Sequence, residues 1–283
     1  MTRASKIIRE AAARLGSAGI EDAAREAEML LMHASDIRRE ALYAHDPEVS
    51  DEAARAMGAY VERRSTREPI QYIIGRVEFL GLNILVGPGV LVPRPETEMM
   101  AAEARRIINE LCGVDATGVL DLCTGSGCLA LAIASENPAL KVDAVDISET
   151  ALSYARRSAE LNDISNVSFL PGDLFAPVAG SRYAMIVSNP PYIVSADIDT
   201  LQPEVSRYEP RAALDGGTDG LVFYRRIVEP APEYLVGGGV LMLELGVAQY
   251  ADVSAMARDA GFADVRAMRD LAGIERVLIA KIK

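Results

Sequence analysis

Polar residues follow the expected ends of several strands, and the first of these motifs contains a glycine turn. It reads Val-Leu-Asp-Leu-Cys-Thr-Gly-Ser-Gly over residues 119–127, an apolar run that leads through the turn into a helix. Gly125 and Gly127 permit positive φ and let a ligand approach the main chain closely. Free N–H groups at the helix start attract a carboxylate or a phosphate. Asp121 can accept a hydrogen bond from a ligand amine or hydroxyl.

Asp146 ends the next apolar run, 21 residues after Gly125, and Ser148 is placed to cap the following helix. An acid at this distance from a glycine turn binds ribose hydroxyls in dinucleotide sites. The pattern Gly125-x-Gly127-x-x-Ala130 also satisfies the loose dinucleotide fingerprint, which is a weak signal by itself. The two motifs indicate a nucleoside-bearing cofactor without deciding which one. A purely structural turn beside an exposed acid stays open at this point.

A third motif, Asn189-Pro190-Pro191-Tyr192, forms a rigid polar tip after the apolar run at 183–188. Asn189 and Pro190 each precede a proline, which favours extended backbone, and a proline has no N–H to offer. The carbonyl of Pro190 and the side-chain oxygen of Asn189 are therefore fixed acceptors beside the ring of Tyr192. Two such acceptors suit a planar NH2 group, because their hydrogen bonds orient it and return electron density to its delocalised nitrogen. The alternative is a proline-rich loop that only ends a strand.

The composition argues against several other classes of protein. The 283 residues carry 29 basic and 41 acidic side chains, a net charge of −12, which disfavours nucleic acid as the main partner. The two histidines, His33 and His45, lie in the first fifth of the chain, so we expect neither histidine-based catalysis nor a metal site. The cysteines Cys112, Cys123 and Cys128 form no CxxC motif, and we expect small buried hydrophobic residues rather than disulfides.

Nothing in the sequence indicates a membrane segment. The longest uncharged stretch, Phe79 to Pro93, is interrupted by Asn83 and Pro88 and falls short of the ~18 apolar residues that a membrane helix needs. The N-terminus leads into an amphipathic helical pattern rather than an apolar signal core. We expect a cytoplasmic monomer.

Periodicity divides the chain into three parts. Residues 1–75 have apolar residues at helical spacing and predict a small helical bundle, either a stabilising cap or a partner-docking module. In residues 76–96, short apolar runs split by Gly87-Pro88-Gly89 predict a β-hairpin linker. Residues 97–283 alternate strands and helices, which predicts an α/β fold with a mostly parallel sheet covered on both faces.

The expected strands are 117–122, 141–146, 166–170, 183–188 and 238–245. The expected helices are 97–111, 127–136, 149–162, 219–235 and 247–260. Residues 262–269 and 274–281 predict a terminal antiparallel hairpin.

Taken together, the motifs resemble the HemK/PrmC family, the peptide chain release factor N5-glutamine methyltransferases. The glycine turn and the Asn-Pro-Pro-Tyr tip are similar to those of class I S-adenosylmethionine-dependent enzymes that modify amino groups. Four further segments narrow the likeness to this family: Glu68–Gly75, Phe79–Gly81, Val92–Glu98 and Tyr208–Leu221. The likeness covers nearly the whole chain. It implies a Rossmann-like methyltransferase domain over 97–283, preceded by a substrate-docking domain.

The resemblance also implies roles for individual residues. S-adenosyl-L-methionine would be the cofactor, giving S-adenosyl-L-homocysteine as product, and its binding residues would be Asp121, Cys123, Thr124, Gly125, Ser126, Gly127, Asp146, Ile147, Asp173, Leu174 and Asn189. Asp146 would bind the ribose, and Asp173 with Leu174 would lie along the adenine. The catalytic residues would be Asn189, Pro190 and Tyr192, which would hold the glutamine carboxamide of the Gly-Gly-Gln motif in a class-1 release factor. Further substrate-binding residues would be Pro93, Arg94, Glu96, Thr97 and Pro191.

Two departures from the family pattern leave alternatives. Cys123 stands where many relatives carry the first glycine, and this version of the turn resembles a sister enzyme that methylates a glutamine of a ribosomal protein. The run Arg94–Glu98 favours the release-factor enzyme instead. Leu174 replaces an aromatic residue seen in some relatives. An adenine-N6 methyltransferase of nucleic acid, an NAD-dependent oxidoreductase and a non-catalytic scaffold are the remaining alternatives.

Overall fold

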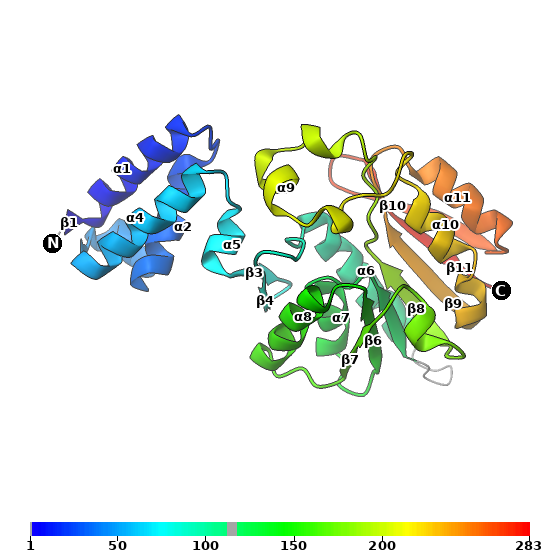
Figure 1. Ribbon diagram of the computed structural model, residues 1–283. Helices are drawn as coiled ribbons and strands as arrows, with labels where there is room; N and C mark the ends of the chain where they lie inside the picture. The colour runs from blue at the N-terminus through cyan, green and yellow to red at the C-terminus, as the bar shows by residue number, and fades with distance from the viewer. Residues whose placement is uncertain (1, 112–117) are drawn as a thin grey trace. The chain divides into compact units, whose positions relative to one another are not determined.

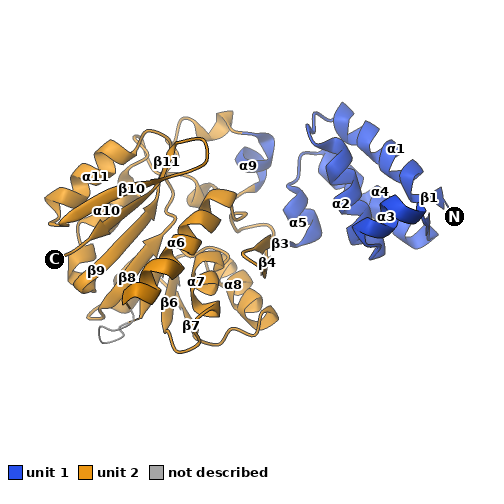
Figure 2. Cartoon of the chain, turned by 180° about the vertical axis from the view of Figure 1, so that it is seen from behind, with its two compact units in different colours: residues 1–76, 202–208 blue, residues 77–201, 209–283 orange. Residues whose placement is uncertain are grey.

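The chain forms two compact units, which Figure 2 colours separately. The structure is a computed structural model and describes residues 2–111 and 118–283. The first unit contains the residues up to 76 together with 202–208, and the second contains 77–201 and 209–283. Residues 202–208 therefore belong to the first unit although they are far from it in the sequence, whereas the sequence analysis divides the chain into contiguous ranges. Cys112 and the first residue of the strand expected at 117–122 lie outside the described residues.

The first unit is helical, as its periodicity predicts. Its helices are α1 (Ala4–Ser17), α2 (Ala23–Ser35), α3 (Arg39–His45), α4 (Asp51–Ser65), α5 (Ile70–Ile74) and α9 (Pro203–Tyr208). The short strands β1 (Thr2–Arg3) and β2 (Glu48–Val49) pair beside them. Leu15, Leu30, Leu31 and Met57 lie in its core. Ser50 caps α4 by accepting from the N–H of Ala53 at 3.1 Å.

A buried ion-pair cluster holds α9 in this unit. Arg64 is only 5% exposed, and its guanidinium contacts carboxylate oxygens of Glu26 and Glu204, the latter at 2.8 Å. Arg67 contacts the second oxygen of Glu204, also at 2.8 Å. The Tyr208 hydroxyl donates to the carbonyl of Thr66 at 2.8 Å. Each partner is charged or hydrogen-bonded, which compensates part of the cost of burying these groups.

The second unit is built on a seven-stranded sheet with the order β10-β11-β9-β8-β5-β6-β7. The strands are β5 (Val119–Leu122), β6 (Val142–Asp146), β7 (Val167–Pro171), β8 (Tyr183–Ser188), β9 (Leu235–Glu244), β10 (Asp264–Arg269) and β11 (Glu275–Lys281). The first five run parallel, and β11 pairs antiparallel with both β9 and β10. The predicted mostly parallel sheet with a terminal antiparallel hairpin is confirmed.

Helices cover both faces of this sheet. Figure 1 shows α6 (Pro95–Leu111), α7 (Cys128–Ser135) and α8 (Glu149–Leu161) on one side, and α10 (Val222–Val228) and α11 (Tyr250–Asp259) on the other. Short 3-10 turns occur at Ala176–Val178 (η1), Ile198–Thr200 (η2), Arg211–Ala213 (η3) and Ala231–Tyr234 (η4). The central strands are buried on both faces, which explains their nearly continuous apolar sequences. Across the described ranges, no helix is long and apolar enough to cross a membrane.

The hairpin predicted within 76–96 is present, but its turn lies elsewhere than expected, and one predicted helix is interrupted. The hairpin strands are β3 (Arg76–Phe79) and β4 (Leu82–Leu85), so the chain turns at Leu80 and Gly81 rather than at the later Gly-Pro-Gly. Both turn residues have positive φ, 47° and 82°, as the tightest hairpin turns require. The single helix expected over 219–235 is interrupted, because Pro230 and Pro232 lack the N–H groups that would continue it.

The strand order creates a ligand crevice at one edge of the sheet. The chain leaves β5 for β6 and β7 on one side, whereas β8 and β9 lie on the other side. In open α/β sheets, ligands bind outside the carboxyl ends of the strands at such a reversal. Leu122 ends β5 opposite Ser188, which ends β8, so the residues that follow both strands emerge together.

We predict that Glu204→Ala lowers the free energy of unfolding of the first unit by about 2 kcal/mol, because it leaves buried Arg64 with one carboxylate fewer. Urea denaturation measures the loss, and hydrogen exchange should show faster exchange in 202–208. Glu10→Ala is the matched control, since Glu10 pairs with Lys6 on an exposed helix surface. Its removal should cost less than about 0.5 kcal/mol. Equal losses for the two variants would contradict an anchoring role for Glu204.

Candidate active site

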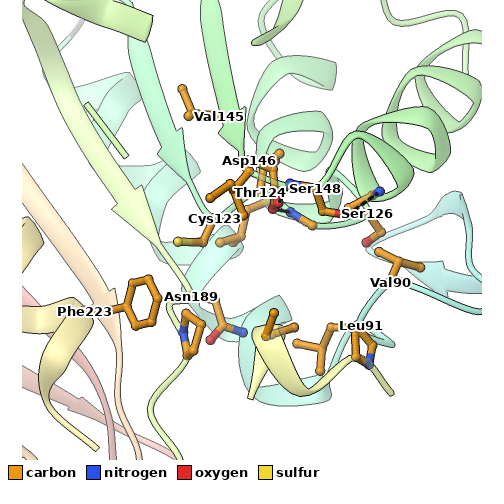
Figure 3. A pocket seen from close by; sticks show the side chains of 18 of the residues that line it. Val90, Leu91, Cys123, Thr124, Ser126, Val145, Asp146, Ser148, Asn189 and Phe223 are labelled. Carbon is orange, nitrogen blue, oxygen red and sulfur yellow. Dashed lines mark hydrogen bonds between the residues drawn. The ribbon is translucent and has the colours of Figure 1, made fainter. Parts of the chain in front are cut away.

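A cavity of about 400 Å³ lies at the carboxyl edge of the sheet in the second unit. Figure 3 shows Asn189 and Phe223 across this cavity from Cys123 and Thr124 of the glycine turn. The structure brings many predicted site residues to its wall: Pro93, Thr97, Cys123, Thr124, Gly125, Ser126, Asp146, Ile147, Asp173, Leu174, Asn189 and Pro191. The predicted residues outside the described lining are Asp121, Gly127, Pro190, Tyr192, Arg94 and Glu96.

The two glycines of the turn are required for different reasons. Gly125 has a φ of 56°, and no atom lies within 4 Å of the position where its Cβ would be, so the main chain faces open space. Gly127 has a φ of 80°, and a Cβ there would lie 2.9 Å from the Cβ of Ala155 on α8. Cys123 itself adopts a φ of 59°, a left-handed conformation that glycine would adopt without strain. Gly125 thus leaves room for a ligand, whereas Gly127 lets α7 and α8 pack closely.

Asp121 lies fully buried beneath the turn. Its Oδ2 accepts from the Thr124 hydroxyl at 2.6 Å and from the N–H of Ala130 at 3.1 Å. Its Oδ1 has no hydrogen-bond partner among the described residues. Burial raises the pKa of Asp121 to about 7, with a smaller contribution from the nearby charge of Asp146. An unsatisfied buried carboxylate oxygen costs stability.

Asp146 joins the turn to the next strand. Its Oδ2 accepts from the N–H of Gly125 at 2.8 Å, and its Oδ1 accepts from the N–H of Ser148 at 2.8 Å. Burial raises its pKa, although these backbone donors oppose the rise. Ser148 caps α8 through the N–H of Ala151 at 3.2 Å, as predicted. The carboxylate lines the cavity beside the exposed side chain of Ile147.

The Asn-Pro-Pro-Tyr tip is anchored at both ends. The hydroxyl of Ser188, immediately before the tip, donates to the carbonyl of Leu122 at 2.7 Å. The Asn189 Nδ2 donates to the Thr97 hydroxyl oxygen at 3.3 Å, which leaves Oδ1 as the acceptor of this side chain. The Tyr192 hydroxyl donates to Glu244 at 3.2 Å, and its carbonyl accepts from Gln249 at 3.0 Å. Burial, followed by the charge of Glu244, raises the pKa of Tyr192, so the phenol is neutral.

The two remaining predicted residues at the entrance are engaged in ion pairs. The Arg94 guanidinium contacts both oxygens of Glu209, at 2.7 and 2.8 Å, and the Glu209 side chain is almost fully buried. Burial raises the pKa of Glu209 even though Arg94 opposes the rise. Glu96 lies 4.0 Å from Arg276. Arg94 is therefore held by a buried partner, and neither of the two side chains is among the described residues that line the cavity.

Several residues of the site were not anticipated. Glu244 ends β9 beside the tip, and Gln249 follows it on the same connection. Phe223 and Arg226 line the cavity, where Arg226 pairs with Asp173 at 2.7 Å. Glu244 has the same sequence pattern as Asp121 and Asp146, an acid at the end of an apolar strand, and this pattern could have identified it. Gln249 and Phe223 carried no comparable signal.

Comparisons with known proteins agree with the geometry. Residues 6–75 match the family model for the PrmC N-terminal domain, and residues 103–204 match that for the methyltransferase small domain. A release factor glutamine methyltransferase from Thermodesulfovibrio yellowstonii is 44% identical over 257 residues, which span 90% of this chain and 91% of the relative. Another with that name, from Geobacter sulfurreducens, is 46% identical over 269 residues, which span 95% and 93%.

The chain belongs to the family of release factor glutamine methyltransferases. This confirms the family that the motifs resemble. A 16S rRNA methyltransferase from T. Thermophilus, solved in complex with AdoMet and guanosine, aligns with a TM-score of 0.52. The alignment covers 74% of this chain and 50% of that protein at 20% identity, which shows a common fold.

We predict that Asp121→Asn stabilises the protein increasingly as the pH rises. The carboxyl ionises near pH 3.8 when exposed and near pH 7 when folded, so its ionisation costs folding free energy that grows between these values. The difference in the free energy of unfolding between variant and wild type should grow by roughly 3 kcal/mol from pH 5 to pH 8. Urea denaturation of both proteins at matched pH measures it. A difference independent of pH would show that Asp121 titrates in the usual range.

Proposed function

We propose that this protein transfers a methyl group from S-adenosyl-L-methionine to the side-chain amide nitrogen, N5, of the glutamine in the Gly-Gly-Gln motif of class-1 peptide chain release factors. The observation that carries the proposal is the orientation of Asn189: its Nδ2 is bound to Thr97, and its Oδ1 is left to accept at the cavity. The names of the relatives support the same substrate. The reaction would serve translation termination in the cytoplasm, with the protein acting as a monomer.

The tip suits a primary carboxamide. Oδ1 of Asn189 and the carbonyl of Pro190 can each accept one of the two hydrogens of the substrate NH2 group. These hydrogen bonds fix the nitrogen and increase the electron density on it, which a delocalised amide nitrogen otherwise lacks. Tyr192, held by Glu244 and Gln249, would pack on the plane of the amide.

The opposite wall fits the cofactor. The unpartnered Oδ1 of Asp121 can accept from the ammonium group of the methionine part, and open space at Gly125 leaves room for that part. Asp146 would bind the ribose, and Ile147, Asp173 and Leu174 would lie along the adenine, since all four line the cavity. Bound there, S-adenosyl-L-methionine supplies an electrophilic methyl group on a sulfonium.

The residues of the tip account for the chemical requirements of the transfer. Overall, the carbon–sulfur bond breaks as a carbon–nitrogen bond forms, and the substrate nitrogen loses one proton to solvent. The tip orients the nitrogen for this exchange and supplies acceptors rather than a strong base. The net charge of −12 disfavours the adenine-N6 alternative, because a nucleic acid needs a basic footprint. The N-terminal helices, residues 1–75, would dock the release factor.

We predict that Asn189→Ala lowers kcat by about 100-fold or more, the loss typical of removing one aimed hydrogen bond. S-adenosylhomocysteine affinity should change by less than about threefold, because the cofactor contacts assigned to Asp121 and Asp146 remain. Mass spectrometry of the release-factor glutamine measures turnover, and calorimetry measures binding. A release factor whose motif reads Gly-Gly-Ala is the negative control, because it lacks the glutamine to be methylated.

These measurements, together with two others, separate the alternative functions. Equal losses of turnover and cofactor affinity would give Asn189 a mainly structural role. Methylation of a ribosomal-protein glutamine or of an oligonucleotide, with no methylation of the release factor, would contradict the proposed substrate. Heat protection by NAD rather than by S-adenosylhomocysteine would contradict the cofactor.

A further inference from the structure

Glu244 is a buried acid whose only part in the proposed chemistry so far is to hold the Tyr192 hydroxyl. It ends β9 and is 2% exposed, and two hydroxyl groups donate to its carboxylate. The Thr97 hydroxyl donates to Oε2 at 2.6 Å, and the Tyr192 hydroxyl donates to Oε1 at 3.2 Å. These donors come from α6 and from the Asn-Pro-Pro-Tyr tip, so one carboxylate connects α6 with the tip.

The direction of each hydrogen bond follows from this carboxylate. An ionised carboxylate only accepts, so Thr97 must direct its single hydroxyl hydrogen toward Glu244. The Thr97 oxygen is then an acceptor, and it receives Asn189 Nδ2 at 3.3 Å. If the Asn189 amide rotated by 180°, its Oδ1 would face an oxygen that has no hydrogen left to donate. The chain from Glu244 through Thr97 therefore allows one orientation of Asn189.

We propose that Glu244 and Thr97 are positioning residues that hold the Asn189 amide with Oδ1 toward the substrate carboxamide. This inference rests on the proposed function and explains how its main acceptor is aimed. The same carboxylate also accepts from the Tyr192 hydroxyl. The positions of the Asn189 amide and of the Tyr192 ring therefore both depend on Glu244. A rigidly held carboxylate matters because small displacements of a positioning group lower turnover strongly.

The energetic cost of Glu244 agrees with a functional role. A buried carboxylate rarely contributes net stability, even when it is paired. Burial raises the pKa of Glu244 to about 6, whereas the donors Thr97 and Tyr192 oppose the rise, so the group is ionised at neutral pH. The titratable and charged groups around it are Glu96 on α6, Cys128 on α7, Tyr192 on the tip, Tyr224 on α10 and Arg276 on β11.

A pair of substitutions at Thr97 tests the hydroxyl directly. Thr97 is 1% exposed, and Thr97→Val keeps its shape without the hydroxyl, whereas Thr97→Ser keeps the hydroxyl. We expect kcat of the valine variant to be at least about tenfold below that of the serine variant. Affinity for S-adenosylhomocysteine and the melting temperature should differ little between the two. Equal kcat values, or a loss that follows cofactor affinity, would overturn the proposal.

Glu244→Gln tests the carboxylate, because a glutamine amide can donate to the Thr97 hydroxyl oxygen. The Thr97 hydroxyl could then donate toward Asn189, which would reverse the direction of both hydrogen bonds. We expect kcat to fall by about tenfold or more, with little change in S-adenosylhomocysteine affinity. With both substrates saturating, kcat of the wild type should decrease below pH 6 as Glu244 takes up a proton. That decrease should be absent in Glu244→Gln. A wild-type kcat that stays constant down to pH 5 would contradict the need for an ionised Glu244.

A readout without substrate separates this inference from the proposed function. In ¹⁵N-labelled protein with bound S-adenosylhomocysteine, the side-chain amide signal of Asn189 should shift and exchange faster in Thr97→Val, but not in Thr97→Ser. That result together with an unmethylated release factor would overturn the proposed substrate and leave the positioning intact. Methylation by the wild type with identical amide signals in both variants would overturn the positioning alone.

Discussion

The reversal of strand order beside β5 is the constraint on which the candidate site depends. Because β6 lies on one side of β5 and β8 on the other, the carboxyl ends of several parallel strands meet around one crevice. The residues at or next to those ends are Asp121, Asp146, Asn189 and Glu244. The Ser188 hydroxyl bonds to the Leu122 carbonyl, which ties the ends of β8 and β5 together beyond their ladder. A small shift between these strands would change the whole site.

This arrangement places two fully buried carboxyl groups, Asp121 and Glu244, and one partly buried carboxyl group, Asp146, near one another. Burial raises the pKa of Asp121, Asp146 and Glu244 alike, and each is held by hydrogen bonds from the neighbouring turn, helix or tip. Asp121 keeps one oxygen without a partner among the described residues, whereas both oxygens of Glu244 are bound. The two acids therefore differ: Asp121 has a free acceptor beneath the glycine turn, whereas Glu244 binds two other side chains. Neither arrangement maximises the stability of the fold.

The sequence predicts the order of strands and helices in the second unit, because buried parallel strands and glycine turns leave strong local signals. Of the cavity wall, these patterns point to Gly125, Asp146 and Asn189, whereas the other predicted lining residues follow from the family resemblance. The sequence fails where one residue changes a boundary, as at Leu80 and Pro230. It also fails for tertiary contacts such as Gln249 with the tip, since such an amide resembles any surface glutamine. Glu244 could have been predicted as a site residue, because it is an acid at the end of a strand, as Asp146 is. The place of 202–208 in the first unit depends on Arg64, more than a hundred residues earlier.

The site supplies hydrogen-bond acceptors where many enzymes supply a base. None of the described residues that line the cavity is a histidine, and the phenol of Tyr192 is neutral. A carboxamide nitrogen is too weak a nucleophile to react without orientation, yet removing its proton beforehand would need a base far stronger than any carboxylate here. In the proposed reaction, two fixed acceptors would raise the electron density on nitrogen while both hydrogens stay in place, and the proton would leave only once the new bond makes it acidic. A rigid tip held by buried hydrogen bonds would meet that requirement without a titrating group in contact with the substrate.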